Sequence, residues 1–485
     1  MLVIGGGATG LGTALDASSR GYRTLLVEQR DFANATSSRS TKLIHGGVRY
    51  LRQGNLHLVR DSLRERGLLL QNSPHLVHKL PFVVPCYAWS DRPFYGIGLK
   101  LYDSLAGSLG LGSTELLSRE ETLSRLPGIE PLGLRGGVLY WDAQFDDARL
   151  AIALAQAVFA HGGVAVNYLR VESLLKENGR VCGALVRDTE IGEQFLVKAR
   201  VVVNATGVFT DAVRRMDAES APRMIAASQG AHIVLPKSFM AGDAAVMVPK
   251  TDDGRVLFAI PWLGRTLIGT TDTPVSETPL EPRPFAEEIE FLLEHAAKYL
   301  ARKPAAGDIL SAWAGLRPLV KAAGDWNTSK LSRDHSLVVS GSGLVTIAGG
   351  KWTTYRKMAE DTVDRAAEVG GLVKRLCVTS RLSLVESESG QADKTPAVTG
   401  LDQSLLTSAA TMESVVRDAV GHEMARSVED VLSRRSRILL LDARGSADVA
   451  PKVAALMAKE LGRDVKWEAG QVAAFKELAR GYLPQ

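Results

Sequence analysis

The feature that most constrains the fold is a glycine-rich turn within the first thirty residues of this 485-residue chain. A short apolar run at residues 2–4 enters Gly5-Gly6-Gly7-Ala8-Thr9-Gly10, which fits the pattern G-x-G-x-x-G. A helical stretch at 11–20 follows, and an expected second strand at 23–27 then ends on Glu28. Strand, glycine turn, helix, strand and acid in this order are typical of a dinucleotide-binding βαβ unit.

Each part of this unit has a physical role in holding a nucleotide. Gly5 allows the tight turn, Gly7 lets a pyrophosphate approach the backbone, and Gly10 lets the helix pack closely on the strand. The helix N-terminus supplies N–H groups and the positive end of a dipole, and Glu28 can accept hydrogen bonds from a ribose diol. A structural turn of an α/β domain is the alternative. The predicted nucleotide contacts here are Gly5, Gly7, Ala8, Thr9, Gly10 and Glu28.

Composition argues against several classes of function. The 58 basic and 54 acidic residues leave a net charge of +4, which does not indicate a nucleic-acid partner. The three cysteines, Cys86, Cys182 and Cys377, lie far apart. They form neither a metal-binding spacing nor a disulfide framework, so we expect no metal and a reducing compartment. No apolar run reaches the length needed to span a bilayer.

Two later turns repeat the pattern of a strand followed by small residues. The expected strand 199–203, which ends in three valines, enters Asn204-Ala205-Thr206-Gly207, and the stretch 344–348 enters Gly349-Gly350-Lys351 before an expected helix. In two-layer flavin proteins the first kind of turn returns the chain to the dinucleotide, and the second aims another helix N-terminus at the ligand. The polar connection 31–55, rich in hydroxyl residues and glycine, suits a backbone that wraps a ligand closely.

Hydrophobic periodicity divides the rest of the chain. Residues 225–335 alternate strands with turns and predict a mostly antiparallel sheet, whereas 401–484 show helical periodicity. We therefore expect an α/β (α+β multidomain) fold. Its parts are a discontinuous Rossmann-like domain (1–80, 145–225 and 336–372), a substrate domain (81–144 and 226–335), a linker (386–400) and a helical C-terminal cap (401–485).

Seven motifs together resemble the flavin-dependent glycerol-3-phosphate dehydrogenases of the D-amino-acid-oxidase-like superfamily. They lie at 4–10, 35–38, 42–51, 203–207, 268–272, 315–319 and 349–357, within residues 2–370. The first motif fits any flavin oxidoreductase, while Lys42-Leu43-Ile44-His45-Gly46-Gly47-Val48-Arg49-Tyr50-Leu51 and Gly349-Gly350-Lys351-Trp352-Thr353-Thr354-Tyr355-Arg356-Lys357 are far more specific. The chain lacks the cysteine-rich regions of anaerobic relatives, so it resembles the aerobic, single-subunit type.

The resemblance implies noncovalently bound FAD and oxidation of sn-glycerol 3-phosphate to dihydroxyacetone phosphate, with electrons passed to a membrane quinone. Two alternatives are a glycerol-3-phosphate oxidase, which uses oxygen and releases hydrogen peroxide, and a flavin-binding protein without turnover. The further cofactor contacts that we expect are Thr36, Ser37, Ser38, Lys42, Leu43, His45, Gly46, Gly47, Ala205, Thr206, Gly207, Gly349, Gly350, Lys351, Trp352 and Thr353.

A dianionic phosphate requires cations, and arginine offers a fork of donors that matches it. Arg317, in a Gly-Leu-Arg-Pro turn, is the first candidate, and Arg333 and Arg49, next to Tyr50, are the others. We predict substrate contacts from Arg49, Tyr50, Arg317 and Arg333. Lys351, at the start of the third turn, is expected to stabilise negative charge at the flavin N1–C2=O edge.

The substrate hydroxyl requires a base, and two histidines compete for this role. His232 lies in a strand of the expected substrate domain, and His45 lies in the flavin-wrapping loop. Either has an unperturbed pKa of about 6.5, which suits proton removal. We predict His232 as the base and His45 as a residue that positions the flavin, with the reverse assignment left open.

Residues 94–111 are apolar with helical spacing, so they predict either a buried helix or a membrane-facing patch. A quinone acceptor would require contact with the bilayer. We therefore expect a cytoplasmic protein attached peripherally to the inner face of the cytoplasmic membrane, through anionic lipid and residues 93–111. The sequence leaves open whether the chain forms a homodimer.

Overall fold

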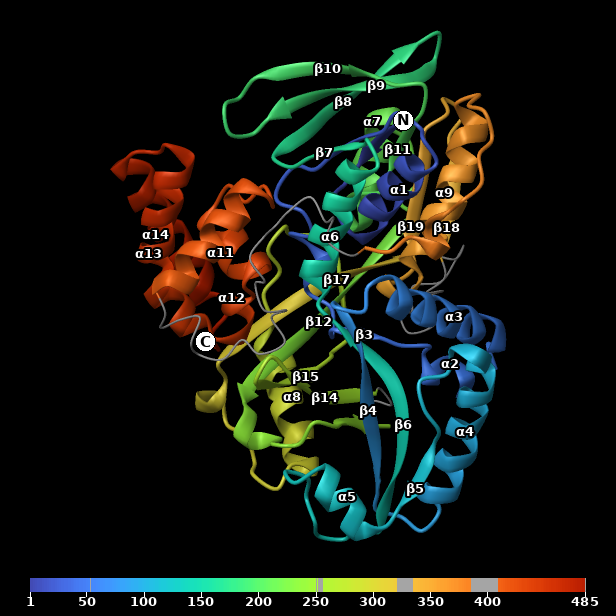
Figure 1. Cartoon of the computed structure of the whole chain (residues 1–485), viewed down its shortest axis with the longest axis vertical. Coiled ribbons are helices and arrows are strands. Elements are labelled where there is room, and N and C mark those ends of the chain that lie inside the picture. The colour runs from blue at the N-terminus through green and yellow to red at the C-terminus, as the bar shows by residue number, and fades with distance from the viewer. Residues whose placement is uncertain (53, 250, 252–255, 321–334, 385–408, 485) are drawn as a thin grey trace.

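The computed structural model describes residues 1–52, 54–249, 251, 256–320, 335–384 and 409–484. The predicted linker at 386–400 therefore lies outside the described residues. The described part contains an N-terminal βαβ unit within a six-stranded sheet, a larger second sheet and a helical C-terminal group (Figure 1). These features confirm the predicted α/β multidomain fold class.

The six-stranded sheet is built from four separate parts of the chain. Its strand order is β18 (His335–Val339), β19 (Val345–Gly349), β11 (Val202–Asn204), β1 (Leu2–Ile4), β2 (Leu25–Val27) and β7 (Val164–Val166). Strand β18 runs antiparallel to β19, and the neighbouring strands from β19 to β7 are parallel. The three predicted small-residue turns follow β1, β11 and β19, so they meet at the carboxyl edge of one sheet, where open α/β sheets bind ligands.

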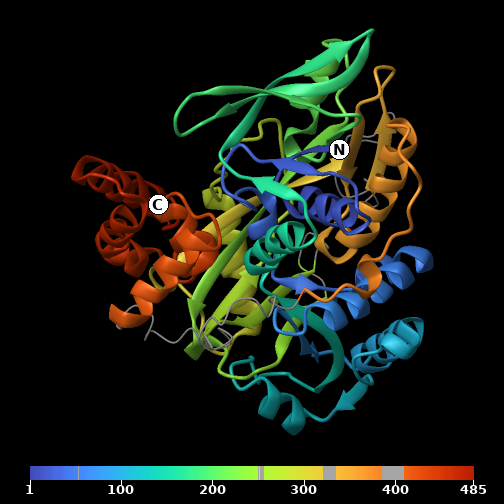
Figure 2. The same ribbon diagram turned by 45° about the horizontal axis from the view of Figure 1, so that its top comes forward.

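Both faces of this sheet are covered. Val3 packs toward helices α1 (Ala8–Ser19), α6 (Asp147–Ala160) and α9 (Tyr355–Val369). Its neighbours Leu2 and Ile4 pack on the other face, toward an antiparallel meander of β8 (Leu169–Glu177), β9 (Arg180–Asp188) and β10 (Gln194–Lys198). Burial of both faces explains why these strands are apolar without alternation. Figure 2 shows the green meander arching over the dark blue N-terminal unit.

The second sheet follows the order β16-β12-β15-β14-β13-β4-β6-β3, with β17 paired to β12 and β5 paired to β6. Its strands are β3 (Leu43–Ile44), β4 (Val77–Cys86), β5 (Glu115–Leu117), β6 (Gly136–Phe145), β12 (Ile225–Pro236), β13 (Ala245–Val248), β14 (Leu257–Trp262), β15 (Arg265–Gly269), β16 (Thr273–Val275) and β17 (Ser311–Val320). All pairings are antiparallel except that of β13 with β4. Strand β4 crosses the predicted domain boundary at residue 80, and β3 brings the wrapping loop into this sheet.

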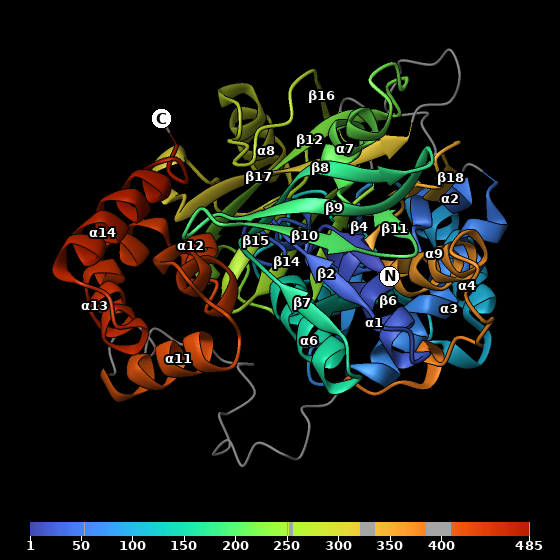
Figure 3. The same ribbon diagram turned by 90° about the horizontal axis from the view of Figure 1, so that it is seen from above.

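Helices surround the second sheet. They include α2 (Val48–Arg52), α3 (Leu56–Asn72), α4 (Asp91–Ala106), α5 (Arg119–Arg125) and α8 (Ala286–Tyr299), and α7 (Thr210–Asp217) follows β11. The C-terminal group comprises α11 (Ala409–Gly421), a π-helical segment (Asp430–Arg435), α12 (Ile438–Leu441), α13 (Ala443–Leu461) and α14 (Val465–Arg480). Figure 3 shows this group on one side of the molecule, away from α4 and α9.

Buried charges attach the C-terminal helices to the nucleotide-binding unit. Asp31, three residues beyond Glu28, is fully buried and forms ion pairs with Arg434 and Arg435. Arg435 Nη2 donates to Asp31 Oδ1 at 2.9 Å. The two arginines hold the pKa of the Asp31 carboxyl below its usual value, although burial alone opposes this. The helical cap is therefore joined to the segment that follows the acidic residue of the nucleotide motif.

Candidate active site

The first glycine turn has the geometry that close nucleotide binding requires. Gly5 has a φ of +110°, in the region that favours glycine. A Cβ atom on Gly10 would lie 1.8 Å from the Gly5 carbonyl oxygen, so only glycine lets α1 begin this close to the turn. The Gly6 N–H donates to Glu28 Oε2 at 2.6 Å, and the Arg30 N–H donates to Oε1 at 2.9 Å. A carboxylate has further lone pairs, which a ribose diol can use.

Burial raises the pKa of the Glu28 carboxyl, while the two main-chain donors oppose that rise.

The second turn lies directly against the first, because a Cβ atom on Gly5 would come within 2.8 Å of the Ala205 oxygen. Thr206 Oγ1 donates to Asn204 Oδ1 at 2.7 Å, and Gly207 has a φ of +58° with no atom within 4 Å of a Cβ position. Space thus remains beside the second turn.

The wrapping loop connects the first turn with the third. Ser37 Oγ accepts from the Ala8 N–H at 2.9 Å, and the Ser37 carbonyl accepts from Trp352 Nε1 at 2.8 Å. Thr36 Oγ1 donates to the Leu316 carbonyl of β17 at 2.6 Å. The segment Thr36–Ser38 is therefore held between both glycine turns and the second sheet.

The third turn contacts the same loop further along. Gly349 and Gly350 both have positive φ, and they lead into Lys351. Lys351 Nζ donates to the His45 carbonyl at 3.4 Å and lies 5.3 Å from the centre of the Tyr50 ring. Thr353 Oγ1 donates to the same His45 carbonyl at 3.3 Å. The structure thus brings Lys351, His45 and Tyr50 together.

Arg317 lies on β17, opposite Ser228 of β12. Its Nη2 donates to Thr270 Oγ1 at 3.0 Å and to the Thr271 carbonyl at 2.9 Å. Its Nη1 contacts Asp272 Oδ1 at 3.4 Å, which is long for a charge-assisted hydrogen bond. The guanidinium side chain is about one fifth exposed, so a ligand can reach it.

His232 is enclosed at the junction of three strands. It lies on β12 between Trp313 of β17 and Gly269 of β15, and it is 2% exposed. Its ring stacks on Trp313 with centroids 4.2 Å apart. Nε2 is 2.9 Å from Thr41 Oγ1 in the wrapping loop. Nδ1 is buried and has no hydrogen-bond partner within the described part of the chain. Burial, together with the positive charges of Arg317 and Lys42, holds the pKa of His232 well below its usual value.

Lys42 has a different environment from the one that a cofactor ligand needs. Its side chain is fully buried, and Nζ donates to both carboxylate oxygens of Asp147, at 2.7 and 2.8 Å, and to the Ser38 carbonyl. Nζ also lies 5.0 Å from the centre of the Trp313 ring, on which His232 stacks. Burial lowers the pKa of this ammonium, and Asp147 opposes the change. The Lys42 ammonium is therefore committed to partners within the protein and does not act as a cofactor ligand.

Two predicted phosphate ligands are not placed by the structure. Arg333 lies outside the described residues, and of Arg49 only the main chain, in α2, is described.

Sequence reasoning missed Thr41, Trp313 and Asp147, which support His232 and Lys42. Thr41 directly precedes a recognised motif, but Trp313 and Asp147 reach the site only through tertiary packing.

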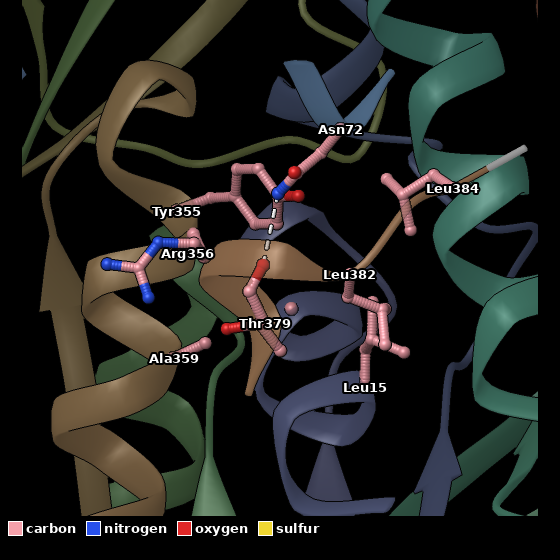
Figure 4. Close-up of a pocket in the computed structure, with 9 residues that line it drawn as sticks. Leu15, Asn72, Tyr355, Arg356, Ala359, Thr379, Leu382 and Leu384 are labelled. Atoms are coloured by element: carbon pink, nitrogen blue, oxygen red, sulfur yellow. Dashed lines mark hydrogen bonds between the residues drawn. The ribbon is translucent and has the colours of Figure 1, made fainter. Parts of the chain in front are cut away.

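A separate small cavity lies between α1, α3 and α9 (Figure 4). Its lining includes Leu15, Asn72, Tyr355 and Thr379, and Asn72 Nδ2 donates to the Thr379 carbonyl at 3.0 Å. None of the predicted ligand residues lines this cavity, so it is not the candidate site.

The described residues fit a flavin adenine dinucleotide. The glycine turn leaves no room for side chains where a pyrophosphate would pass, Glu28 can bind a ribose, and the buried His232 Nδ1 faces no protein partner among the described residues. No group of at least three histidine, cysteine or acidic side chains suited to a metal ion occurs among the described residues.

Comparison with known proteins gives consistent results. The family model "FAD dependent oxidoreductase" matches residues 1–356, and the model "C-terminal domain of alpha-glycerophosphate oxidase" matches residues 345–468. The chain is 39% identical to the mitochondrial glycerol-3-phosphate dehydrogenase of Macaca fascicularis, over all of this chain and 73% of that protein. It is also 39% identical to the mitochondrial glycerol-3-phosphate dehydrogenase of Arabidopsis thaliana, over all of this chain and 85% of that one.

Among solved structures, the chain is similar to the glycerol-3-phosphate dehydrogenase from Bacillus halodurans complexed with FAD. The TM-score is 0.80 at 30% identity, covering all of this chain and 95% of the other.

Proposed function

This chain belongs to the family of FAD-dependent glycerol-3-phosphate dehydrogenases, and we propose that it oxidises sn-glycerol 3-phosphate to dihydroxyacetone phosphate with FAD as its cofactor. The observation that carries the proposal is the position of the wrapping loop. This loop contacts the nucleotide turn through Ser37, the third turn through His45 and the substrate-domain histidine His232 through Thr41. A flavin held by the turns would thereby lie next to the strands that carry His232 and Arg317.

FAD, when bound, supplies the acceptor for the hydride that leaves C2 of the substrate. The main-chain N–H groups at the start of α1, with Glu28, would hold the adenosine diphosphate part. Lys351 and the N-terminus of α9, which follows Thr353, place positive charge near the His45 loop. Positive charge there stabilises the negative charge that a flavin gains on reduction.

Arg317 is the proposed partner of the substrate phosphate. Its contact with Asp272 at 3.4 Å is longer than its contacts with Thr270 and Thr271, so a phosphate oxygen can replace Asp272 at lower cost. The contacts with Thr270 and Thr271 would keep the guanidinium plane fixed while it binds. Arg49, Tyr50 and Arg333 remain further predicted contacts.

His232 is the proposed base for the C2 hydroxyl proton. Its low pKa keeps the imidazole neutral at pH 7, so one ring nitrogen can accept a proton. If Nδ1 is that nitrogen, Nε2 must carry the hydrogen and donate it to Thr41 Oγ1. Trp313 fixes the plane of the ring by stacking. His45 is retained as the alternative base.

The cofactor is tested directly. We expect purified protein to carry one FAD per chain and to release it into the supernatant on acid precipitation, because the proposed contacts of the glycine turns and Glu28 with the cofactor are noncovalent. Yellow colour that stays in the pellet would contradict noncovalent binding. A protein without flavin would contradict the proposed function as a whole.

We also propose a membrane quinone as the electron acceptor and peripheral attachment to the inner face of the cytoplasmic membrane. The support is the surface of α4. Phe94, Ile97 and Leu101 are 58%, 73% and 47% exposed, and their spacing places them on one side of the helix. Leu99 and Tyr102 are buried on the other side. Among the described residues, no helix is both long and apolar enough to cross a bilayer.

An exposed apolar helix face beside the exposed Lys100 suits the boundary between lipid headgroups and acyl chains. We expect vesicles that contain anionic lipid to carry the protein upward in a flotation gradient. A double variant with Ile97→Glu and Leu101→Glu should float less and reduce quinone more slowly, while reducing a soluble dye at the normal rate. Equal loss of both activities would show that this face belongs to the fold and not to a membrane contact.

The oxidase alternative makes a different prediction. If oxygen were the acceptor, oxygen consumption would equal substrate oxidation and hydrogen peroxide would accumulate. When quinone and dye are both absent, we expect no oxygen consumption that matches substrate oxidation and no accumulation of hydrogen peroxide.

A further inference from the structure

One peptide group in the wrapping loop, that between His45 and Gly46, is held at both of its ends. Its carbonyl accepts hydrogen bonds from Lys351 Nζ at 3.4 Å and from Thr353 Oγ1 at 3.3 Å. Its N–H donates to the Tyr102 hydroxyl oxygen at 2.7 Å. The carbonyl side belongs to the third glycine turn, whereas Tyr102 comes from α4, 56 residues further along the chain.

The approach of Tyr102 is close and buried. The Tyr102 side chain is 1% exposed. A Cβ atom on residue 46 would lie 2.6 Å from the tyrosine oxygen and 2.5 Å from Leu63, so only glycine admits this contact. A main-chain N–H buried here without an acceptor would be costly. The Tyr102 hydroxyl removes that cost.

The direction of the hydrogen bonds is fixed by their chemistry. Because the Gly46 N–H can only donate, the Tyr102 oxygen accepts from it, and the Tyr102 O–H is left to donate. Its acceptor is Asp142 of β6, with oxygen-to-oxygen distances of 2.9 and 3.1 Å. Arg66 of α3 donates to the same carboxylate at 2.6 Å. A chain of donors and acceptors thus runs from Arg66 through Asp142 and Tyr102 to Gly46.

This chain is anchored in the core. Arg66 and Asp142 are both about 2% exposed. Burial raises the pKa of Asp142, and the charge of Arg66 opposes the rise. Burial also raises the pKa of the Tyr102 hydroxyl well above its usual value, so the hydroxyl keeps its hydrogen. One end of this chain of hydrogen bonds is therefore fixed in the core, and its other end is a peptide of the wrapping loop.

We propose that Tyr102 is a positioning residue for the oxidation, because its hydroxyl sets the orientation of the His45–Gly46 peptide and thereby the place of Lys351 beside the flavin. The inference rests on the proposed function, since it assumes that this loop faces FAD. Tyr102 itself touches neither the Arg317 contacts nor His232 in any described hydrogen bond.

The test compares Tyr102→Phe with Tyr140→Phe. Tyr140 is an equally buried neighbour on β6, 6.3 Å away between ring centroids, whose hydroxyl contacts the Met247 sulfur instead of the loop. We expect Tyr102→Phe to lower kcat about tenfold or more, because displacement of an active-site group by a fraction of an ångström is costly. We expect the KM for glycerol 3-phosphate to stay within about twofold, because Arg317 is unaffected.

Two further readouts do not depend on turnover. Tyr102→Phe should raise the FAD dissociation constant about tenfold and change the visible absorption spectrum of the bound flavin. Tyr140→Phe should leave the spectrum, the FAD dissociation constant and kcat unchanged, even if its melting temperature falls by a similar amount. Wild-type values of kcat, FAD affinity and spectrum in Tyr102→Phe would overturn the inference.

If Tyr102→Phe does not fold, Arg66→Lys tests the same chain of hydrogen bonds from its other end. This variant keeps a cation at the outer end of the chain but loses the guanidinium geometry. A lower kcat at unchanged KM supports the inference, whereas an unchanged kcat or an equal effect on both parameters overturns it. Failure of the proposed function is distinguishable, because the wild-type protein would then lack FAD or would not reduce it with substrate.

Discussion

Replacement of Gly10 by alanine tests the nucleotide turn with a magnitude that follows from the structure. The added Cβ atom would lie 1.8 Å from the Gly5 carbonyl oxygen and 2.9 Å from its carbon. Because non-bonded heavy atoms settle at about 3.5 Å, the start of α1 must move away from the turn by more than about 1 Å. Overpacking of this kind costs roughly 1–3 kcal/mol, against a gain of about 1 kcal/mol for alanine over glycine in a helix.

The first-turn N–H groups of α1 move with the helix, and loss of a hydrogen bond to a charged pyrophosphate costs roughly 1.5–3 kcal/mol, which lowers FAD affinity by about tenfold to a hundredfold. Gly470→Ala is the matched control, because Gly470 lies within α14 and a Cβ atom there meets nothing within 4 Å. The control should gain about 0.5–1 kcal/mol of stability and bind FAD normally. Affinity is measured by quenching of flavin fluorescence on apoprotein. Wild-type affinity in Gly10→Ala would refute the close approach of helix and turn.

Three further predictions concern the substrate side. Arg317→Ala should raise the KM for glycerol 3-phosphate far more than that for glycerol, since loss of a charged phosphate partner costs about 2–5 kcal/mol; equal effects on both substrates would exclude Arg317 as the phosphate partner. His232→Ala should lower kcat about a hundredfold or more with unchanged FAD content, and if His45→Ala gives this defect instead, the two roles are exchanged. Because the pKa of His232 is lowered on folding, the unfolded chain binds more protons below pH 6.5 and the native state loses stability as the pH falls. Between pH 6.5 and 5.5, urea unfolding of the wild type should therefore lose about 1 kcal/mol more than that of His232→Gln; equal losses would mean that His232 is not held neutral.

Local sequence patterns predicted those parts of the site that depend on the chain's own neighbours. The turn at Gly5, Gly7 and Gly10 needs only adjacent residues, so its spacing identifies it, and the structure shows the predicted strand, helix and strand around it. The third turn is similar, because a strand and a helix flank Gly349 and Gly350.

Contacts between distant segments were not predictable from those patterns. Lys42 lies in a specific motif, yet its ammonium is committed to Asp147, 105 residues away. Tyr102 carries no motif and reaches Gly46 only because α4 packs against the wrapping loop and β6. The residue types at these positions reveal no partner, because a buried lysine or tyrosine is specified by the fold around it.

The measurement that tests the central claim most directly is an anaerobic titration of the purified protein with sn-glycerol 3-phosphate. The account predicts that the oxidised flavin spectrum bleaches with one equivalent of substrate per chain, and that one equivalent of dihydroxyacetone phosphate forms. Glycerol at the same concentration should leave the spectrum unchanged, because it offers no phosphate to Arg317. A flavin that stays oxidised in the presence of excess glycerol 3-phosphate would contradict the proposed reaction.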